Sequence, residues 1–210
     1  MGSILMATKG MILVTGCSGL VGTHLCQKLE EDGYSVVGVD IKFSPALPAT
    51  EQFQFHNIDL RDADDVRVLF DQYEFTAVIN AFGVKGSPIR AKEKPIDFLE
   101  PSIKVNTNII DNCVRTNCWL VYMSSVGVYE PAEVFEESSV WKTLPSPNDW
   151  FPSWSKRIPE LYLEAYKVFN KMGATFKKEH SETIRNNAIK KFDKNFQLKK
   201  YDELYQSLLN

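Results

Sequence analysis

Three glycines just after a short apolar run form a pattern with the chemistry of a phosphate site. Gly16, Gly19 and Gly22 follow Ile12 to Val14, and from residue 20 to residue 29 apolar side chains recur at helical spacing. In such a strand, turn and helix, the first glycine permits the turn, the second lets the backbone approach a pyrophosphate, and the third lets the helix pack closely. The phosphates would then lie at the helix N-terminus, where free N–H groups and the helix dipole favour an anion. The alternative is a structural turn in an α/β domain that binds no nucleotide.

Asp40 is the residue that would determine whether the dinucleotide is NAD or NADP. It ends a second buried apolar run, Val36 to Val39, where a carboxylate can accept hydrogen bonds from a ribose 2′-OH. The same carboxylate would repel a 2′-phosphate. The sequence therefore predicts NAD rather than NADP, although the nearby Lys42 could offset part of that repulsion.

The elements that must position these residues alternate along the chain. Five short apolar runs predict strands, and the amphipathic segments between them predict helices. The expected strands are 12–14, 34–40, 53–58, 77–80 and 119–123, and the expected helices are 20–29, 63–73 and 96–117. Asp62 is a candidate cap for the second helix, Pro101 predicts a late start or a kink in the third, and 83–95 is expected to be a polar loop.

This alternation predicts an α/β fold: a doubly wound, Rossmann-like parallel sheet of about five strands, with helices on both faces and a C-terminal helical tail. In such sheets the ligand lies beyond the carboxyl ends of the strands. Five residues are expected at those ends, namely Gly16, Asp40, Asp59, Ala81 and Ser125.

Composition limits the remaining possibilities. The chain has 210 residues, 44% of them apolar, and a net charge of −3, which is typical of one globular domain and argues against nucleic acid as a general partner. We expect a leader at 1–10, an NAD-binding domain at 11–171 and a helical tail at 172–210. The sequence shows neither an apolar run long enough to span a bilayer nor a signal peptide, so we expect the cytoplasm. The four cysteines lack metal-ligand spacing; we expect reduced thiols and no bound metal.

Taken together, the motifs resemble the extended short-chain dehydrogenase/reductase family, the NAD-dependent sugar-nucleotide epimerases and dehydratases. They occur in family order over roughly residues 11 to 170. The matching segments are 15–22 (T-G-C-S-G-L-V-G), Asp40, Asp59-Leu60, 80–83 (N-A-F-G), 108–110 (N-I-I), 124–129 (S-S-V-G-V-Y), and 154–157 (W-S-K-R) with Glu160.

The resemblance implies a role for each matching residue. Ser125 would orient a substrate hydroxyl or carbonyl, and Lys156 would bind the nicotinamide ribose and lower the pKa of a catalytic tyrosine. The implied cofactor-binding residues are Gly16, Ser18, Gly19, Leu20, Val21, Gly22, Asp40, Asp59, Leu60, Ala81, Phe82, Gly83 and Lys156, with Asp59 and Leu60 near the adenine.

The catalytic tyrosine is where the sequence departs from the family. The family places it four residues before the lysine, and here that position is Pro152. We expect Tyr162 and Tyr166 to pack against neighbouring helices, because helical geometry turns them away from the required position. Tyr129 could reach the cleft, but in the family the tyrosine at this place is not the acid. Pro159 would remove one helix hydrogen bond if the helix has begun by Ser155.

The C-terminal part departs further. A family member continues for well over a hundred residues past the lysine, adding strands and a substrate domain, whereas 54 residues follow Lys156 here. We therefore expect an exposed sheet edge and a partly exposed face unless the tail covers them. Residues 188–192, followed by a helix ending at 201–209, resemble the last helices of a two-domain nucleotide-sugar glycosyltransferase. A generic basic amphipathic helix explains them equally well.

Two functions remain open. One is an epimerase or dehydratase that acts on a nucleotide sugar by transient hydride transfer, impaired by the loss of its tyrosine. The other is a catalytically inactive NAD-binding module that associates with itself or a partner through its tail.

Overall fold

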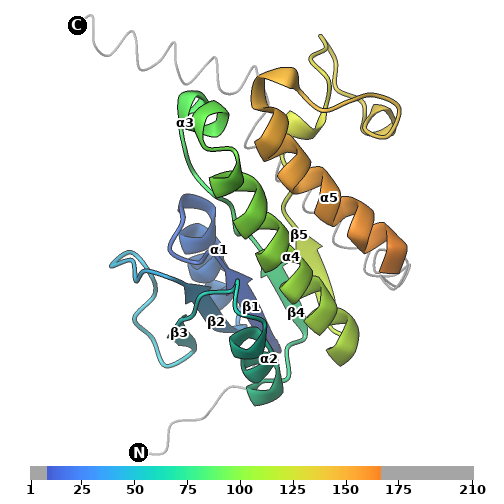
Figure 1. The fold of residues 1–210 in the computed structure, drawn as a ribbon. Helices are drawn as coiled ribbons and strands as arrows, with labels where there is room; N and C mark the ends of the chain where they lie inside the picture. Colours follow the sequence, from blue (N-terminus) through green and yellow to red (C-terminus); the bar gives the residue numbers. More distant parts are fainter. Residues whose placement is uncertain (1–8, 167–210) are drawn as a thin grey trace, which may run out of the picture. The chain divides into compact units, whose positions relative to one another are not determined.

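The computed structural model describes residues 9–166 (Figure 1). The helical tail expected at 172–210 and most of the leader expected at 1–10 lie outside the described residues.

The centre of the fold is a five-stranded parallel sheet. Its strands are β1 (Met11–Thr15), β2 (Ser35–Asp40), β3 (Phe53–Asn57), β4 (Ala77–Asn80) and β5 (Trp119–Tyr122). They lie in the order β3-β2-β1-β4-β5, so the order reverses between β1 and β4. Every pairing is parallel. The predicted doubly wound parallel sheet is confirmed, and the reversal places the ligand crevice above the carboxyl ends of β1 and β4.

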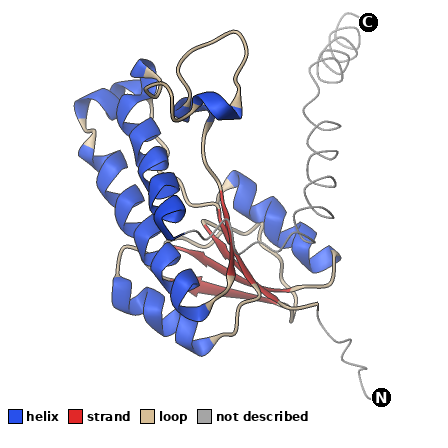
Figure 2. Cartoon of the chain, turned by 90° about the vertical axis from the view of Figure 1, so that its right-hand side faces the viewer, coloured by secondary structure: helices blue, strands red, loops and turns tan. Residues whose placement is uncertain are grey.

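Helices cover the sheet on both sides (Figure 2). Because side chains alternate along a strand, Leu13 contributes to one core and its neighbours Ile12 and Val14 to the other. The first core also contains apolar side chains of α2 (Ala63–Gln72), α4 (Ile96–Thr116) and α5 (Trp150–Tyr166). The second contains those of α1 (Leu20–Glu31). On this second side of β5, Val121 keeps 37% of its surface exposed, in line with the expected partly exposed face.

Local signals explain where the helices begin. The Asp62 carboxylate accepts hydrogen bonds from the backbone N–H groups of Asp64 and Asp65, which confirms it as the cap of α2. The expected loop 83–95 is partly wrong, because it contains the short helix α3 (Pro88–Glu93). Ser87 caps α3 by accepting from the Arg90 N–H, and the proline follows at the first helical position, which needs no donor.

Two prolines lie inside longer helices. α4 begins at Ile96, five residues before Pro101, so a late start is wrong. α5 begins at Trp150, so Pro159 lies in its interior and removes one helix hydrogen bond, as expected for a helix already formed at Ser155. No helix within residues 9–166 is both long enough and apolar enough to cross a bilayer.

Candidate functional site

A cleft of about 680 Å³ lies at the carboxyl ends of the first four strands, where the sheet order reverses. Its walls come from the turn after β1, the end of β2, and the segments that follow β3 and β4. Eleven of the residues predicted to bind the cofactor line it, namely Gly16, Gly19, Leu20, Val21, Gly22, Asp40, Asp59, Leu60, Ala81, Phe82 and Gly83. The fold thus gathers into one cavity residues that lie up to 67 positions apart in the chain.

The turn after β1 requires glycine at two positions. Gly16 has a φ of +65°, in the left-handed region that other residues rarely adopt. A Cβ atom at Gly22 would lie 2.2 Å from the Gly16 carbonyl oxygen and 2.7 Å from Cys17 Cα, so no side chain fits there. Gly19 is less constrained, since its Cβ would meet only that oxygen, at 3.2 Å. The geometry agrees with a tight turn at the first glycine and close packing at the third.

The N-terminus of α1 opens on this cleft. Its N-cap residue is Gly19, which has no side chain to accept hydrogen bonds from the first turn. The first two helical residues, Leu20 and Val21, line the cleft and remain 70% and 46% exposed. An uncapped helix N-terminus offers free N–H donors and a positive dipole end, and both fit a pyrophosphate.

The backbone holds the Asp40 carboxylate in place. Its Oδ2 accepts from the Ser18 N–H at 3.1 Å, and its Oδ1 accepts from the Ile41 N–H at 2.8 Å. Each oxygen keeps a lone pair for a further donor, such as a ribose hydroxyl. Ser18 itself is not part of the cleft lining, and its hydroxyl donates to the Lys42 carbonyl oxygen at 2.5 Å. The structure thus gives Ser18 a supporting position behind the carboxylate.

The next part of the cleft contains an ion pair between Asp59 and Arg61. The Arg61 Nε lies 2.9 and 3.0 Å from the two carboxylate oxygens of Asp59, and its terminal nitrogen lies 2.5 Å from Oδ2. The Arg61 side chain lowers the pKa of Asp59, chiefly through these hydrogen bonds. Sequence reasoning identified Asp59 but missed Arg61, which also lines the cleft.

A buried chain of hydrogen bonds fixes the strands beneath the cleft. Thr15 Oγ1 donates to Asn80 Oδ1 at 2.6 Å, and Asn80 Nδ2 donates to Asn106 Oδ1 at 2.8 Å. The chain ends where Asn106 Nδ2 donates to the Ser102 carbonyl oxygen. It connects β1, β4 and α4 in a dry interior where each polar group needs its partner. It thereby sets the spacing of β1 and β4 at the reversal point.

Lys156 lies across the ends of β4 and β5. Its Nζ donates to the Phe82 carbonyl oxygen at 2.8 Å and to the Met123 carbonyl oxygen at 3.0 Å. Burial lowers the pKa of Lys156 to about 8, against an opposing effect of the nearby Glu160. An ammonium carries three hydrogens, and these two carbonyls use two of them. The lysine is thus suited to hold a third acceptor, such as a ribose oxygen.

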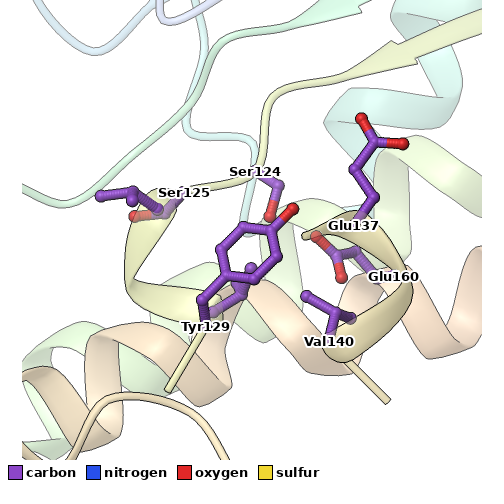
Figure 3. Close-up of a pocket in the computed structure, with 8 residues that line it drawn as sticks. Ser124, Ser125, Tyr129, Glu137, Val140 and Glu160 are labelled. Atoms are coloured by element: carbon purple, nitrogen blue, oxygen red, sulfur yellow. The ribbon is translucent and has the colours of Figure 1, made fainter. Parts of the chain in front are cut away.

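A second, smaller pocket of about 460 Å³ lies beside the end of β5, and Figure 3 shows the side chains that line it. The segment after β5 contributes Ser124, Ser125 and Tyr129. Ser125 Oγ accepts from the Gly127 N–H at 3.2 Å, so its own hydrogen remains available to donate. The structure therefore places Ser125 and Tyr129 around one cavity.

Glu160 lines this pocket, although sequence reasoning left it out of the predicted site. It lies one helical turn after Lys156 on α5 and lines the pocket together with Glu137 (Figure 3). Burial raises the pKa of Glu160, while the Ser124 hydroxyl, Arg157 and Lys156 act in the opposite direction. The signal in the sequence was its four-residue spacing from the lysine, which places both side chains on one side of the helix.

The position four residues before Lys156 carries no phenol. Pro152 lies in the first turn of α5, and its carbonyl oxygen accepts from Ser155 Oγ at 2.7 Å. Tyr162 is directed to α4, where its hydroxyl donates to Asp111 Oδ1 at 2.9 Å and lies 3.5 Å from that of Tyr166. The expected helix packing of Tyr162 is confirmed. Neither tyrosine substitutes for the missing hydroxyl.

Arg157 anchors the segment 130–149, which carries part of the second pocket's wall. It is only 3% exposed and lies between the rings of Trp141 and Trp154. Its guanidinium donates to the carbonyl oxygens of Val140 and Thr143. Burial lowers the pKa of this guanidinium. The buried cation thus ties an otherwise irregular segment to α5.

The chain is similar in sequence to one known protein family. A family model described as the NAD dependent epimerase/dehydratase family matches residues 12–178. UDP-glucose 4-epimerase 2 of Arabidopsis thaliana is 32% identical over 149 residues, which are 64% of this chain and 42% of the relative. A UDP-glucose 4-epimerase of Caenorhabditis elegans is 24% identical over 192 residues, or 78% of this chain and 54% of the relative.

Solved structures show the same partial coverage. The UDP-Glc/GlcNAc 4-epimerase from Campylobacter jejuni has a TM-score of 0.67 and 25% identity, covering 77% of this chain and 50% of its own. The UDP-glucose 4-epimerase of Thermus thermophilus, solved in complex with NAD, has a TM-score of 0.63 and 26% identity, covering 74% and 50%. The chain thus spans about half the length of these relatives.

Proposed function

Because the chain belongs to the NAD dependent epimerase/dehydratase family, we propose that its larger cleft binds NAD and that it acts on a nucleotide sugar by transient hydride transfer, with an impaired proton-transfer step. The observation that carries this proposal is the cleft itself. An uncapped helix N-terminus and a backbone-held carboxylate, Asp40, line one cavity at the sheet's reversal point. These features suit the pyrophosphate and a ribose diol of one dinucleotide.

Different residues around the cleft would hold the cofactor and the substrate. Bound NAD would supply the hydride acceptor. Lys156 would hold the nicotinamide ribose with its third N–H, because its other two are committed to the carbonyls of Phe82 and Met123. Ser125 would donate its remaining hydrogen to the substrate oxygen at the reacting carbon. The substrate class, a nucleotide sugar, is supported by the UDP-glucose 4-epimerases that the chain resembles.

The impairment follows from Pro152. A positioned acid–base group contributes roughly 10²–10⁴ in rate, and a proline ring cannot hold or release a proton. Lys156 retains the lowered pKa of about 8, which would suit it to support a phenolate one helical turn earlier. Within the described residues, the lysine that would assist a catalytic tyrosine is thus present, but the position four residues before it is a proline.

The experiment restores the missing hydroxyl. The full chain with NAD and UDP-glucose or UDP-galactose should interconvert the sugars slowly, and Pro152→Tyr should raise that rate by roughly 10²–10⁴. Pro152 lies in the first turn of α5, where a backbone N–H needs no partner, so the helix should accept the change. Pro152→Phe is the matched control, because it adds the ring without the hydroxyl. Equal rates in the tyrosine and phenylalanine variants would contradict the proposal.

The absence of the phenol also favours a second candidate, an NAD-binding module without turnover. This version predicts that the parent chain and Pro152→Tyr both bind NAD and that neither converts a nucleotide sugar. Sugar conversion by the parent chain would exclude it. Its association surface would be the tail at 172–210, and a variant lacking this tail should then change its oligomeric state in sedimentation experiments.

A further inference from the structure

Two of the four cysteines lie at the junction where α4 ends and β5 begins. Cys113 belongs to the last turn of α4 and is buried, whereas Cys118 immediately precedes β5 and is partly exposed. A hydrogen bond joins the two thiols, and the Cys113 thiol is its donor. Neither cysteine lines the larger cleft or the second pocket, so the chemistry of this pair is separate from the proposed function.

The backbone at this junction forms a turn that brings the two cysteines together. Asn117 has a φ of +54°, in the left-handed region, and reverses the chain after the helix. The Cys118 N–H then donates to the Cys113 carbonyl oxygen at 3.1 Å, and the Asn117 N–H donates to the Val114 carbonyl oxygen at 3.3 Å. These two hydrogen bonds define a Schellman motif, in which the side chains at the positions of Cys113 and Cys118 commonly contact each other.

This geometry meets the requirements of a disulfide. A disulfide joins cysteines whose Cα atoms lie roughly 4.4–6.8 Å apart and whose side chains point toward each other. The direct backbone hydrogen bond keeps the Cα atoms of Cys113 and Cys118 close, and the hydrogen bond between their thiols shows that the side chains converge. The bond would close a short loop within one turn, so it can form without moving distant elements.

The two thiols also differ in the way that a two-step oxidation requires. The thiolate is the form of cysteine that reacts with a peroxide, and it must be accessible to do so. The hydrogen bond from Cys113 lowers the pKa of Cys118 to about 7, while burial raises the pKa of Cys113. Cys118 thus combines partial exposure with ionisation near neutral pH, and Cys113 lies beside it as the second thiol.

We propose that Cys113 and Cys118 are a redox-active pair that a peroxide converts to an intrachain disulfide and a dithiol reductant reopens. In the first step the Cys118 thiolate attacks one peroxide oxygen, the O–O bond breaks, and Cys118 becomes a sulfenic acid while hydroxide leaves. In the second step the Cys113 sulfur attacks the Cys118 sulfur. The S–S bond forms as the S–O bond breaks, and the oxygen leaves as water with the Cys113 proton. The two thiols lose two electrons in total, and the peroxide takes them up.

Peptide mapping of the full chain tests this proposal. Trypsin cleaves after Lys104, Arg115 and Lys142, so the two cysteines fall on separate peptides, 105–115 and 116–142. After treatment with hydrogen peroxide near neutral pH and blocking of the remaining thiols, these peptides should appear as one crosslinked species. A dithiol reductant should separate them again, and a non-reducing gel should show that no bond joins two chains.

Two variants distinguish the roles of the thiols. Cys118→Ser should form neither the crosslink nor a sulfenic acid. Cys113→Ser should leave a sulfenic acid on Cys118, which dimedone traps, because no second thiol remains to react with it. The matched control is Cys26→Ser. Cys26 and its neighbour Cys17 are also a pair of thiols, but both are fully buried, and burial raises the pKa of each to about 12. This control should crosslink like the parent.

In the parent, free Cys118 should disappear at least roughly tenfold faster than free Cys17. Equal rates, oxidation of Cys118 without the crosslinked peptides, or a crosslink between chains would each overturn the inference. Unreacted thiols at Cys113 and Cys118 after peroxide treatment would overturn it as well. The measurements on the parent need no variant, so they remain decisive even if a serine variant does not fold. None of these outcomes depends on what the cleft binds.

Discussion

Lys156 should make the free energy of unfolding rise with pH, whereas a surface lysine in an ion pair makes it fall. Its ammonium lies in a mostly buried position against two carbonyl oxygens, and burial lowers its pKa from 10.5 to about 8. Below pH 8 the folded and unfolded chains both carry this charge, so the folded state bears the full cost of burying it. Between pH 8 and 10.5 the unfolded chain binds more protons, so this residue makes stability rise with pH.

The magnitude follows from the pKa difference. Each unit corresponds to ~1.4 kcal/mol, so the lowering of the Lys156 pKa amounts to about 3 kcal/mol of added stability on going from pH 7.5 to pH 10.5. Other groups titrate in this window, and comparison with Lys156→Met removes them because both proteins share them. Relative to the methionine variant, the parent should therefore gain about 3 kcal/mol across the window.

Urea denaturation followed by tryptophan fluorescence at pH 7.5, 9 and 10.5 measures this difference. The control is Lys104→Met, which removes a lysine whose side chain is 57% exposed and paired with Glu100 on the surface of α4. The difference between the parent and this control should stay nearly constant. If the parent and Lys156→Met keep a constant difference across the same range, Lys156 is not buried as a costly charge, and its position against the carbonyl oxygens of Phe82 and Met123 is contradicted.

Three further predictions rest on single contacts. Gly22→Ala should destabilise the fold by about 1–3 kcal/mol or more, since its Cβ would lie 2.2 Å from a backbone oxygen, whereas Gly19→Ala should cost far less; thermal unfolding of both would compare them, and equal losses would contradict the turn geometry. A hydrogen bond from the Cys113 thiol lowers the pKa of Cys118 to about 7, and the other three cysteines are buried. Cys118 should therefore react first with iodoacetamide near pH 7. Mass spectrometry would locate the label, and first labelling of another cysteine would refute this. Arg157→Met should cost about 1–3 kcal/mol and speed proteolysis within 130–149, because two carbonyls lose their donor; unchanged cleavage would show that the segment is held by other contacts.

The parts of the fold that the sequence predicted are those set by local patterns. The turn at Gly16 and the buried runs of β1 and β2 have signatures within a few residues of one another, and the structure follows them closely. The short helix α3 was missed although its signal was local too, because Ser87 followed by a proline is a helix start in the middle of a polar segment. A loop and a six-residue helix have similar compositions, so polarity alone did not separate them.

The parts of the site that the sequence did not predict are those set by tertiary contacts. Asn106 contacts Asn80 only when α4 packs on the sheet, and Arg61 lines the cleft only because the segment after β3 lies beside those that follow β1, β2 and β4. Glu160 belongs to a segment that matches the family, but the sequence did not predict that it lines the second pocket. Part of that pocket's wall is the segment 130–149, which Arg157 holds in place. The spacing of residues along the chain does not show which distant elements come into contact.

The measurement that bears most directly on the central claim is calorimetric titration of the full chain with NAD and with NADP, repeated on Asp40→Ala. The Asp40 carboxylate is held by two backbone N–H groups at the edge of the cleft. There it would accept a hydrogen bond from a ribose hydroxyl and would repel a 2′-phosphate. We therefore expect one NAD per chain, NADP at least roughly tenfold weaker, and a much smaller gap in the alanine variant. An absence of heat with NAD, or equal binding of the two dinucleotides by the parent chain, would contradict the account.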